Sequence, residues 1–222
     1  MDLREIAALI TLEWRLDRRQ KHAWGSLALY VVSTVYTCYL GVKRLSAVPT
    51  WNALFWIILL FAAFNALSRS FQREEGGRQL YLHTLVHPRS VVLARTLYNA
   101  ATMVVLSLIS LVTYVLFIGD RALEAADPGL FITTVLLGAV GLACTLTLIA
   151  AIAARAGSGP ALMASLGFPI VLPLLLAILR ASKLALDGVA WSVTGNYLLA
   201  ILAMDVLAVA LSAILFPYLW RD

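Results

Sequence analysis

The sequence holds six apolar runs long enough to cross a bilayer, and these runs constrain the fold more than any other feature. They occupy residues 24–42, 51–68, 91–118, 129–154, 161–180 and 196–219. A membrane-spanning helix needs about 20 predominantly apolar residues, and a helix satisfies its own backbone hydrogen bonds in lipid. The chain is 62% hydrophobic and 13% charged, against about 45–50% and about 25% in soluble domains. We therefore predict an all-α integral membrane bundle of six transmembrane helices, a single domain over residues 1–222, and exclude a soluble enzyme or a nucleic-acid-binding domain.

The basic residues predict that both termini face the cytoplasm. With the N-terminus inside, 12 of the 17 Lys and Arg residues fall in inner segments and five in outer ones, and cytoplasmic loops are the ones enriched in basic residues. Aromatic residues near the ends of the runs suggest an interfacial belt, consisting of Trp51, Trp56, Trp191, Tyr197, Tyr218 and Trp220.

Residues 1–22 predict an amphipathic helix that lies in the membrane interface before the first span. Apolar residues from Leu3 to Leu16 share one side at 100° per residue, and Arg15, Arg18 and Arg19 gather on the opposite arc. Such a helix turns its basic side toward anionic head groups; a simple topology anchor is the alternative. Glu13 and Asp17 interrupt the apolar arc, so we expect them to pair with basic residues of the next cytoplasmic segment.

Residues 69–90 form the longest polar segment and are the candidate binding surface for a partner. A short amphipathic helix is expected between the double glycine and Pro88, and its apolar face needs a membrane or a partner subunit to cover it. An ordinary solvated loop is the alternative. The candidate contact residues are Phe71, Arg73, Glu74, Glu75, Gly76, Gly77, Leu80 and Leu85.

Polar and proline residues inside the spans suggest two further sites. Pro169 and Pro173 remove two helix donors in the fifth span, which predicts a kink that could serve as a hinge or only shape the packing. Asp205 is the one acidic residue deep in a predicted span and should face the bundle interior. Asn65 is a candidate partner for it, either in a structural hydrogen bond or in a substrate or proton site.

The motifs of ATP-binding loops, serine hydrolases and zinc proteases do not occur in the sequence, so we expect no catalytic residues. His83 and His87 have the i, i+4 spacing of a metal pair. However, His87 precedes proline, which disfavours a helix there, and the segment supplies no further ligand. No metal site is therefore predicted.

Three patterns, in this order along the chain, resemble the CcmB family, also called haem exporter protein B. The first is Leu12-Glu13-Trp14-Arg15 with Arg18-Arg19. The second runs from Phe71 through Glu74-Glu75, Gly77 and Leu80 to Pro88 and Val92-Leu93-Ala94-Arg95. The third is Leu166-Gly167-Phe168-Pro169 followed by Pro173-Leu174-Leu175. The resemblance covers essentially the whole chain.

The resemblance implies an ABC-2-like permease subunit of the cytochrome c maturation system in the bacterial inner membrane. Its partners would be an ATP-binding subunit, a haem-handling membrane subunit, a small single-span subunit and a haem chaperone, with a homodimer as a further possibility. ATP would be bound by the partner subunit and haem would be the cargo of the complex; no cofactor of this chain itself is expected. Residues 69–90 would couple ATP hydrolysis to haem delivery or to release of the loaded chaperone. The alternatives are an exporter of another hydrophobic substrate and a non-transporting membrane scaffold.

Overall fold

The computed structural model describes residues 3–19, 21–41, 47–68, 86–156 and 159–221, and within them it contains helices and no strand. The long helices are α1 (Leu3–Arg19), α2 (Lys21–Gly41), α3 (Val48–Leu67), α5 (Pro88–Ile118), α6 (Pro128–Arg155), α7 (Gly159–Leu186) and α8 (Trp191–Arg221). A short 3₁₀ turn, η2 (Arg121–Leu123), lies between α5 and α6.

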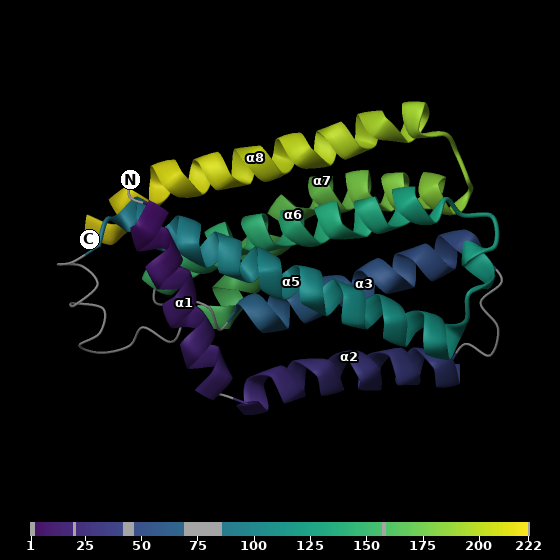
Figure 1. Ribbon diagram of the computed structural model, residues 1–222, viewed down its shortest axis with the longest axis horizontal. Helices are drawn as coiled ribbons and strands as arrows, with labels where there is room; N and C mark the ends of the chain where they lie inside the picture. Colours follow the sequence, from purple (N-terminus) through teal and green to yellow (C-terminus); the bar gives the residue numbers. More distant parts are fainter. Residues whose placement is uncertain (1–2, 20, 42–46, 69–85, 157–158, 222) are drawn as a thin grey trace.

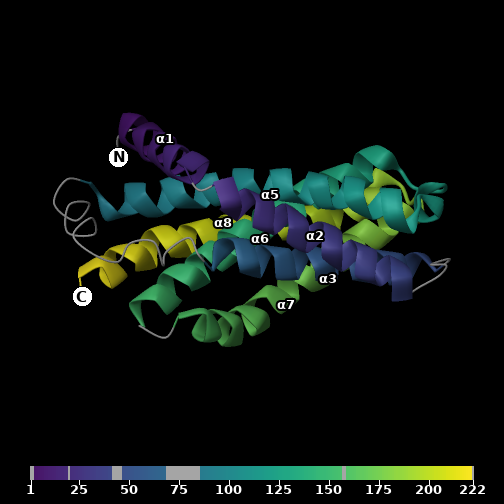
Figure 2. The same cartoon turned by 90° about the horizontal axis from the view of Figure 1, so that it is seen from below.

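Six of the helices lie side by side along the long axis of the molecule, and α1 crosses them at one end (Figures 1 and 2). Helices α3, α5, α6, α7 and α8 are long and apolar enough to span a membrane, and the apolar part of α2, Gly25–Gly41, is shorter. Helix α1 begins, and α8 ends, at the same end of the bundle (Figure 1). The all-α membrane bundle predicted from the sequence is confirmed.

Helix α6 is the centre of the bundle and packs against α3, α5, α7 and α8. Its glycines allow this close packing, as small residues do in membrane helices. A Cβ added at Gly138 would lie 2.7 Å from Cη2 of Trp56, and one at Gly141 would lie 2.4 Å from Oδ1 of Asp205. Neither position therefore has room for a larger residue.

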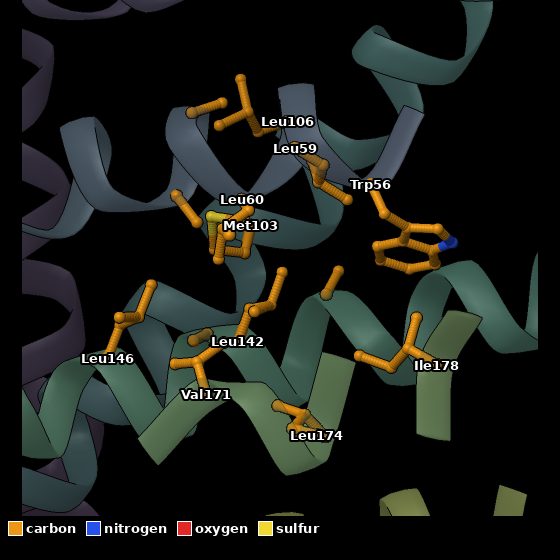
Figure 3. Close-up of a cluster of buried hydrophobic side chains, with 14 of the residues drawn as sticks. Trp56, Leu59, Leu60, Met103, Leu106, Leu142, Leu146, Val171, Leu174 and Ile178 are labelled. Atoms are coloured by element: carbon orange, nitrogen blue, oxygen red, sulfur yellow. The ribbon is translucent and has the colours of Figure 1, made fainter. Parts of the chain in front are cut away.

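The core around α6 is a cluster of buried aliphatic and aromatic side chains (Figure 3). Helices α3, α5, α6 and α7 all contribute to it, with Trp56, Leu59, Leu60, Met103, Leu106, Leu142, Leu146, Val171, Leu174 and Ile178. Apolar side chains also cover the outer faces of α5, α7 and α8, where large residues such as Leu116, Leu176 and Leu199 are exposed. This inside-out distribution of exposed apolar residues fits a surface covered by lipid.

A hydrogen-bonded group fixes α3 against α7. Trp56 Nε1 donates to Ser182 Oγ at 3.0 Å, Ser182 Oγ donates to Asn52 Oδ1 at 2.8 Å, and Asn52 Nδ2 donates to the Leu179 carbonyl at 3.0 Å. Buried polar groups in a bundle are tolerated when they are paired in this way. The group links elements that are more than 120 residues apart in the sequence.

Trp51 and Trp56 do not belong to the interfacial belt that their positions predicted. Both are about 1% exposed, and the Trp51 ring packs edge-on against Tyr114 with centroids 4.8 Å apart. Trp191 and Tyr218, by contrast, are exposed. Position along the chain places a residue near the end of a span but does not say which side of the helix it occupies. The two tryptophans of α3 lie on the side that faces the core.

The helix boundaries differ modestly from the predicted ones. Helix α1 ends at Arg19 and helix α2 begins at Lys21, so the first span starts before the residue 24 expected from the apolar run. Helix α5 begins at Pro88, which makes the last residues of the 69–90 segment the first turn of α5. Helices α7 and α8 extend past the expected 161–180 and 196–219, because a helix continues beyond its purely apolar part.

Candidate coupling site

The described part of the candidate coupling site is the contact between α1 and the first turns of α5, where the polar segment 69–90 enters the bundle. Residues 69–85 lie outside the described part of the chain. The predicted contact residues that fall there are Phe71, Arg73, Glu74, Glu75, Gly76, Gly77, Leu80 and Leu85, and their roles stay predictions.

Helix α1 presents an acidic face to α5. Its three acidic residues, Glu5, Glu13 and Asp17, follow one another at spacings of eight and four residues, which keeps them within one broad side of the helix. All three bind groups of α5 or of the residue before it. We call this contact, formed by Glu5, Glu13, Asp17, Ser90, Arg95 and Tyr98, the α1–α5 clamp.

Glu13 and Arg95 form the ion pair of the clamp. Arg95 Nη2 donates to Glu13 Oε1 at 3.2 Å, and the side chains are 5% exposed for Arg95 and 21% for Glu13. Arg95 lies in the third turn of α5, so its guanidinium is buried against the bundle and the carboxylate on α1 compensates its charge. The expected pairing of Glu13 with a basic residue of the following polar segment is thus met by Arg95.

Glu5 holds the start of α5. The His87 backbone N–H donates to Glu5 Oε1 at 3.0 Å, and the Ser90 hydroxyl donates to Glu5 Oε2 at 2.7 Å. His87 is the N-cap of α5 and has an extended backbone, with φ −68° and ψ 132°, as a residue before proline should. The carboxylate supplies the cap that the imidazole does not. The Ser90 hydroxyl bond is the largest cause that lowers the pKa of Glu5; desolvation opposes it, and the His87 backbone bond adds to the lowering.

Asp17 completes the clamp with the next turn of α5. It is buried, and it accepts a short hydrogen bond from the Tyr98 hydroxyl. A short bond between a phenol and a carboxylate is charge-assisted and stronger than a neutral one. The three acids therefore fasten α1 along three turns of α5 rather than at one point.

The opposite side of α1 is basic. Arg4, Arg15 and Arg18 are exposed, and the side chain of Arg19 lies outside the described residues. Leu12 and Trp14 are also exposed, the latter at 52%. The amphipathic helix expected over residues 1–22 is present, but its bundle-facing side carries acids as well as Ile6 and Leu9.

Asp205 lies in the middle of α8, buried as predicted, but without the expected partner. Its exposed fraction is 5%, and among the described residues neither carboxylate oxygen has a hydrogen-bond partner. The proposed bond to Asn65 is therefore not formed. The reason is the arrangement of the helices: α8 packs against α5, α6 and α7, whereas Asn65 is on α3, on the other side of α6.

The two prolines of the fifth span do not interrupt it. Helix α7 runs from Gly159 to Leu186 through Pro169 and Pro173, and both prolines are exposed. Two residues earlier, a Cβ on Gly167 would lie 2.9 Å from Cε1 of Phe64, so α7 is packed tightly on α3 just before the prolines. The hinge role of Pro169 and Pro173 stays a prediction.

Ser90 and Tyr98 are parts of the site that were not predicted from the sequence. Tyr98 lies three residues after Arg95 and so on the same face of α5, and this polar pair at the start of an apolar run was the available sign. Ser90 lies five residues before Arg95, a spacing that does not place the two on one face. Within the described ranges, no group of three or more His, Cys, Asp or Glu residues could hold a metal ion.

A comparison with protein families gives a match to the CcmB protein family over residues 4–219. The chain belongs to the CcmB family. No curated protein and no solved structure matches it. As a CcmB protein, also known as haem exporter B, the chain is a multi-pass protein of the bacterial inner membrane, the permease component of the ABC-type haem exporter of cytochrome c maturation.

Proposed function

We propose that this CcmB protein transmits ATP hydrolysis by a separate ATP-binding subunit to haem delivery, or to release of the haem-loaded chaperone. The observation that carries the proposal is the α1–α5 clamp. Residues 69–87 lead directly into α5, and Glu5 binds the backbone N–H of His87, the last residue before that helix.

The clamp would transmit a displacement of residues 69–87 to two helices, α5 and α1. A displacement of residues 69–87 by a partner would reach His87 first, and through Glu5 it would reach α1 as well. Helix α5 packs on α1, α2, α3, α6 and α8. Its 31 residues form a rod of about 46 Å at 1.5 Å per residue, so motion at one end is carried through the bundle.

The remainder of the chain supports a non-catalytic role. Nearly all of it is used for the spans and for α1, so ATP would be bound by the partner and haem would be cargo of the complex. The other proposed partners are a haem-handling membrane subunit, a small single-span subunit and the chaperone. A second copy of this chain is a further candidate, since ABC transport requires two membrane halves.

The test is the double substitution Glu74→Ala with Glu75→Ala in the complete complex. We expect less ATP-binding subunit to co-purify with the membrane protein and less c-type cytochrome to accumulate, because two charges of the docking segment are lost. The matched control is Asp120→Ala with Glu124→Ala, which removes two exposed acids at the opposite end of the bundle.

Two results would contradict the proposal. Normal subunit recovery and normal cytochrome assembly in the Glu74/Glu75 variant would remove the coupling role from this segment. A purified complex without any nucleotide-binding subunit would instead favour the membrane scaffold.

A further inference from the structure

The surface of α1 that faces away from the bundle has an unusual charge distribution. All three acidic residues of α1 are turned toward α5 and occupied there. The outward arc retains Arg4, Arg15 and Arg18. Folding has thus separated the charges of one helix into an acidic inner face and a basic outer face.

An open groove of about 430 Å³ lies along α1, lined by Leu12, Arg15, Leu16 and Arg18. Arg15 and Arg18 are three residues apart, Leu12 and Leu16 are four apart, and Leu12 is three from Arg15, so the two arginines and the two leucines form adjoining pairs along the helix. Arg15 and Arg18 are exposed, and no ion pair to either forms among the described residues. Two guanidinium groups with free donors beside two leucines suit a ligand that has an anionic head and an apolar body.

The position of α1 relative to the bilayer identifies that ligand. Helix α5 is about 46 Å long, whereas the hydrocarbon core is about 30 Å thick. The charged residues of α5, Arg89 and Arg95, are in its first turns, whereas its last turn is apolar, so we place the excess of about 16 Å at the first turns, in the head-group layer. Those turns are where Glu5 and Glu13 hold α1, and the exposed Trp14 on the same helix is a residue typical of that layer.

We propose that the groove on α1 binds an anionic phospholipid, with Arg15 and Arg18 on its phosphate and Leu12 and Leu16 against its acyl chains. The site is independent of the ATP-binding partner and of haem. The lipid stabilises α1 in the orientation in which its acidic face reaches α5, so it supports the clamp from outside.

The test uses the full-length protein, purified in neutral detergent, with phosphatidylglycerol and phosphatidylcholine as probes. Native mass spectrometry measures how many lipids of each kind are retained. We expect preferential retention of phosphatidylglycerol, and a loss of about 10- to 30-fold in its affinity for Arg15→Gln with Arg18→Gln, since each basic residue at an anionic surface contributes about fivefold. The preference should also decrease with rising salt concentration.

Two variants separate the head group from the acyl chains. Arg121→Gln with Arg180→Gln makes the same change in charge at two exposed positions outside the groove and should leave retention unchanged. Leu12→Gln keeps all the charges and should weaken phosphatidylglycerol binding without affecting inorganic phosphate.

The proposal is overturned by any of three results. The first is equal retention of the two lipids. The second is unchanged retention in the Arg15/Arg18 variant. The melting temperature of this variant is measured as well, and because both side chains are exposed we expect it to equal that of the wild type. The third is displacement of the lipid by millimolar inorganic phosphate, which would reduce the groove to a phosphate site.

Discussion

Glu13 and Asp205 are both acidic residues in contact with the bundle, but their surroundings differ: within the described part of the chain, one carboxylate is paired with a basic residue and the other is not. Glu13 lies on α1 at the polar end and is paired with Arg95 at 3.2 Å. Asp205 lies in the middle of α8, and among the described residues its carboxylate oxygens have no partner. It lies against Gly141 of α6, where an added Cβ would meet its Oδ1 first.

The difference separates two ways of holding helices together. At the clamp, specific polar contacts position α1, and breaking one of them leaves a buried charge on the other helix. Around Asp205, the shape of the packing positions α8: α6 supplies a glycine, and the carboxyl group occupies the space where a side chain would be. Stability should therefore depend on charge in the first region and on volume in the second.

The largest expected effect is at the clamp. Glu13→Gln keeps the shape of the side chain and removes the charge that compensates Arg95. We expect the free energy of unfolding to fall by about 2–3 kcal/mol, below the range of about 3–5 kcal/mol for fully buried pairs because Glu13 is partly exposed. Unfolding by SDS titration in mixed micelles measures it.

The control for this change is Glu124→Gln, which alters an exposed acid beyond the other end of α5 and should leave stability within about 0.5 kcal/mol of the wild type. Equal stability of both variants would mean that the Arg95 charge is compensated elsewhere. The clamp would then lose its main electrostatic element.

The sequence predicted the spans because each is a long apolar run between charged or turn-forming residues, and this property is local. It also predicted that Glu13 needs a basic partner, since an acid on an apolar arc is costly. It could not predict which face each helix turns to the core. Trp51 and Trp56 were therefore assigned to the lipid interface, and Asn65 was paired with Asp205 across a helix that stands between them.

The clamp was predictable only in part, for a related reason. Ser90 and Tyr98 lie in what reads as the start of a span, and their partners are more than 80 residues earlier. Helical periodicity groups residues on one face but does not say which other helix meets that face. That information depends on the packing of the whole bundle.

The second prediction tests the volume side of the comparison. Gly141→Ala would place a methyl group 2.4 Å from Asp205 Oδ1 and 3.2 Å from Leu174 Cδ1. We expect a loss of about 1–3 kcal/mol from overpacking, measured by the same SDS titration.

Two further variants distinguish overpacking from a general effect of alanine. In Gly195→Ala, also in a helix, the added Cβ meets nothing within 4 Å. This variant should be neutral or slightly stabilising, since alanine has a higher helix propensity than glycine. Adding Asp205→Ala to Gly141→Ala should recover part of the loss, because it removes the atom that the new methyl group meets first. Strictly additive effects would show that Gly141 and Asp205 are not in direct contact.

The smallest expected effect concerns the pH dependence of the contact between Glu5 and Ser90. The pKa of Glu5 in the folded protein is lowered from 4.5, mainly by the Ser90 hydroxyl bond. A group with a lowered pKa contributes stability that is present above the unfolded value and is lost as the pH falls through the folded value. Ser90→Ala should therefore lower the melting temperature slightly at pH 7, and the difference from the wild type should shrink below about pH 4.5.

Ser33→Ala is the matched control for this pH profile, because the Ser33 hydroxyl donates to a backbone carbonyl, that of Tyr30, and meets no carboxylate. Its effect on the melting temperature should be the same at both pH values. If the Ser90 and Ser33 variants responded alike to pH, the negative charge of Glu5 would have no part in capping α5. The clamp would then depend on Glu13 and Asp17, deeper along α5, and the start of the helix would be the part of this contact that a partner could most easily release.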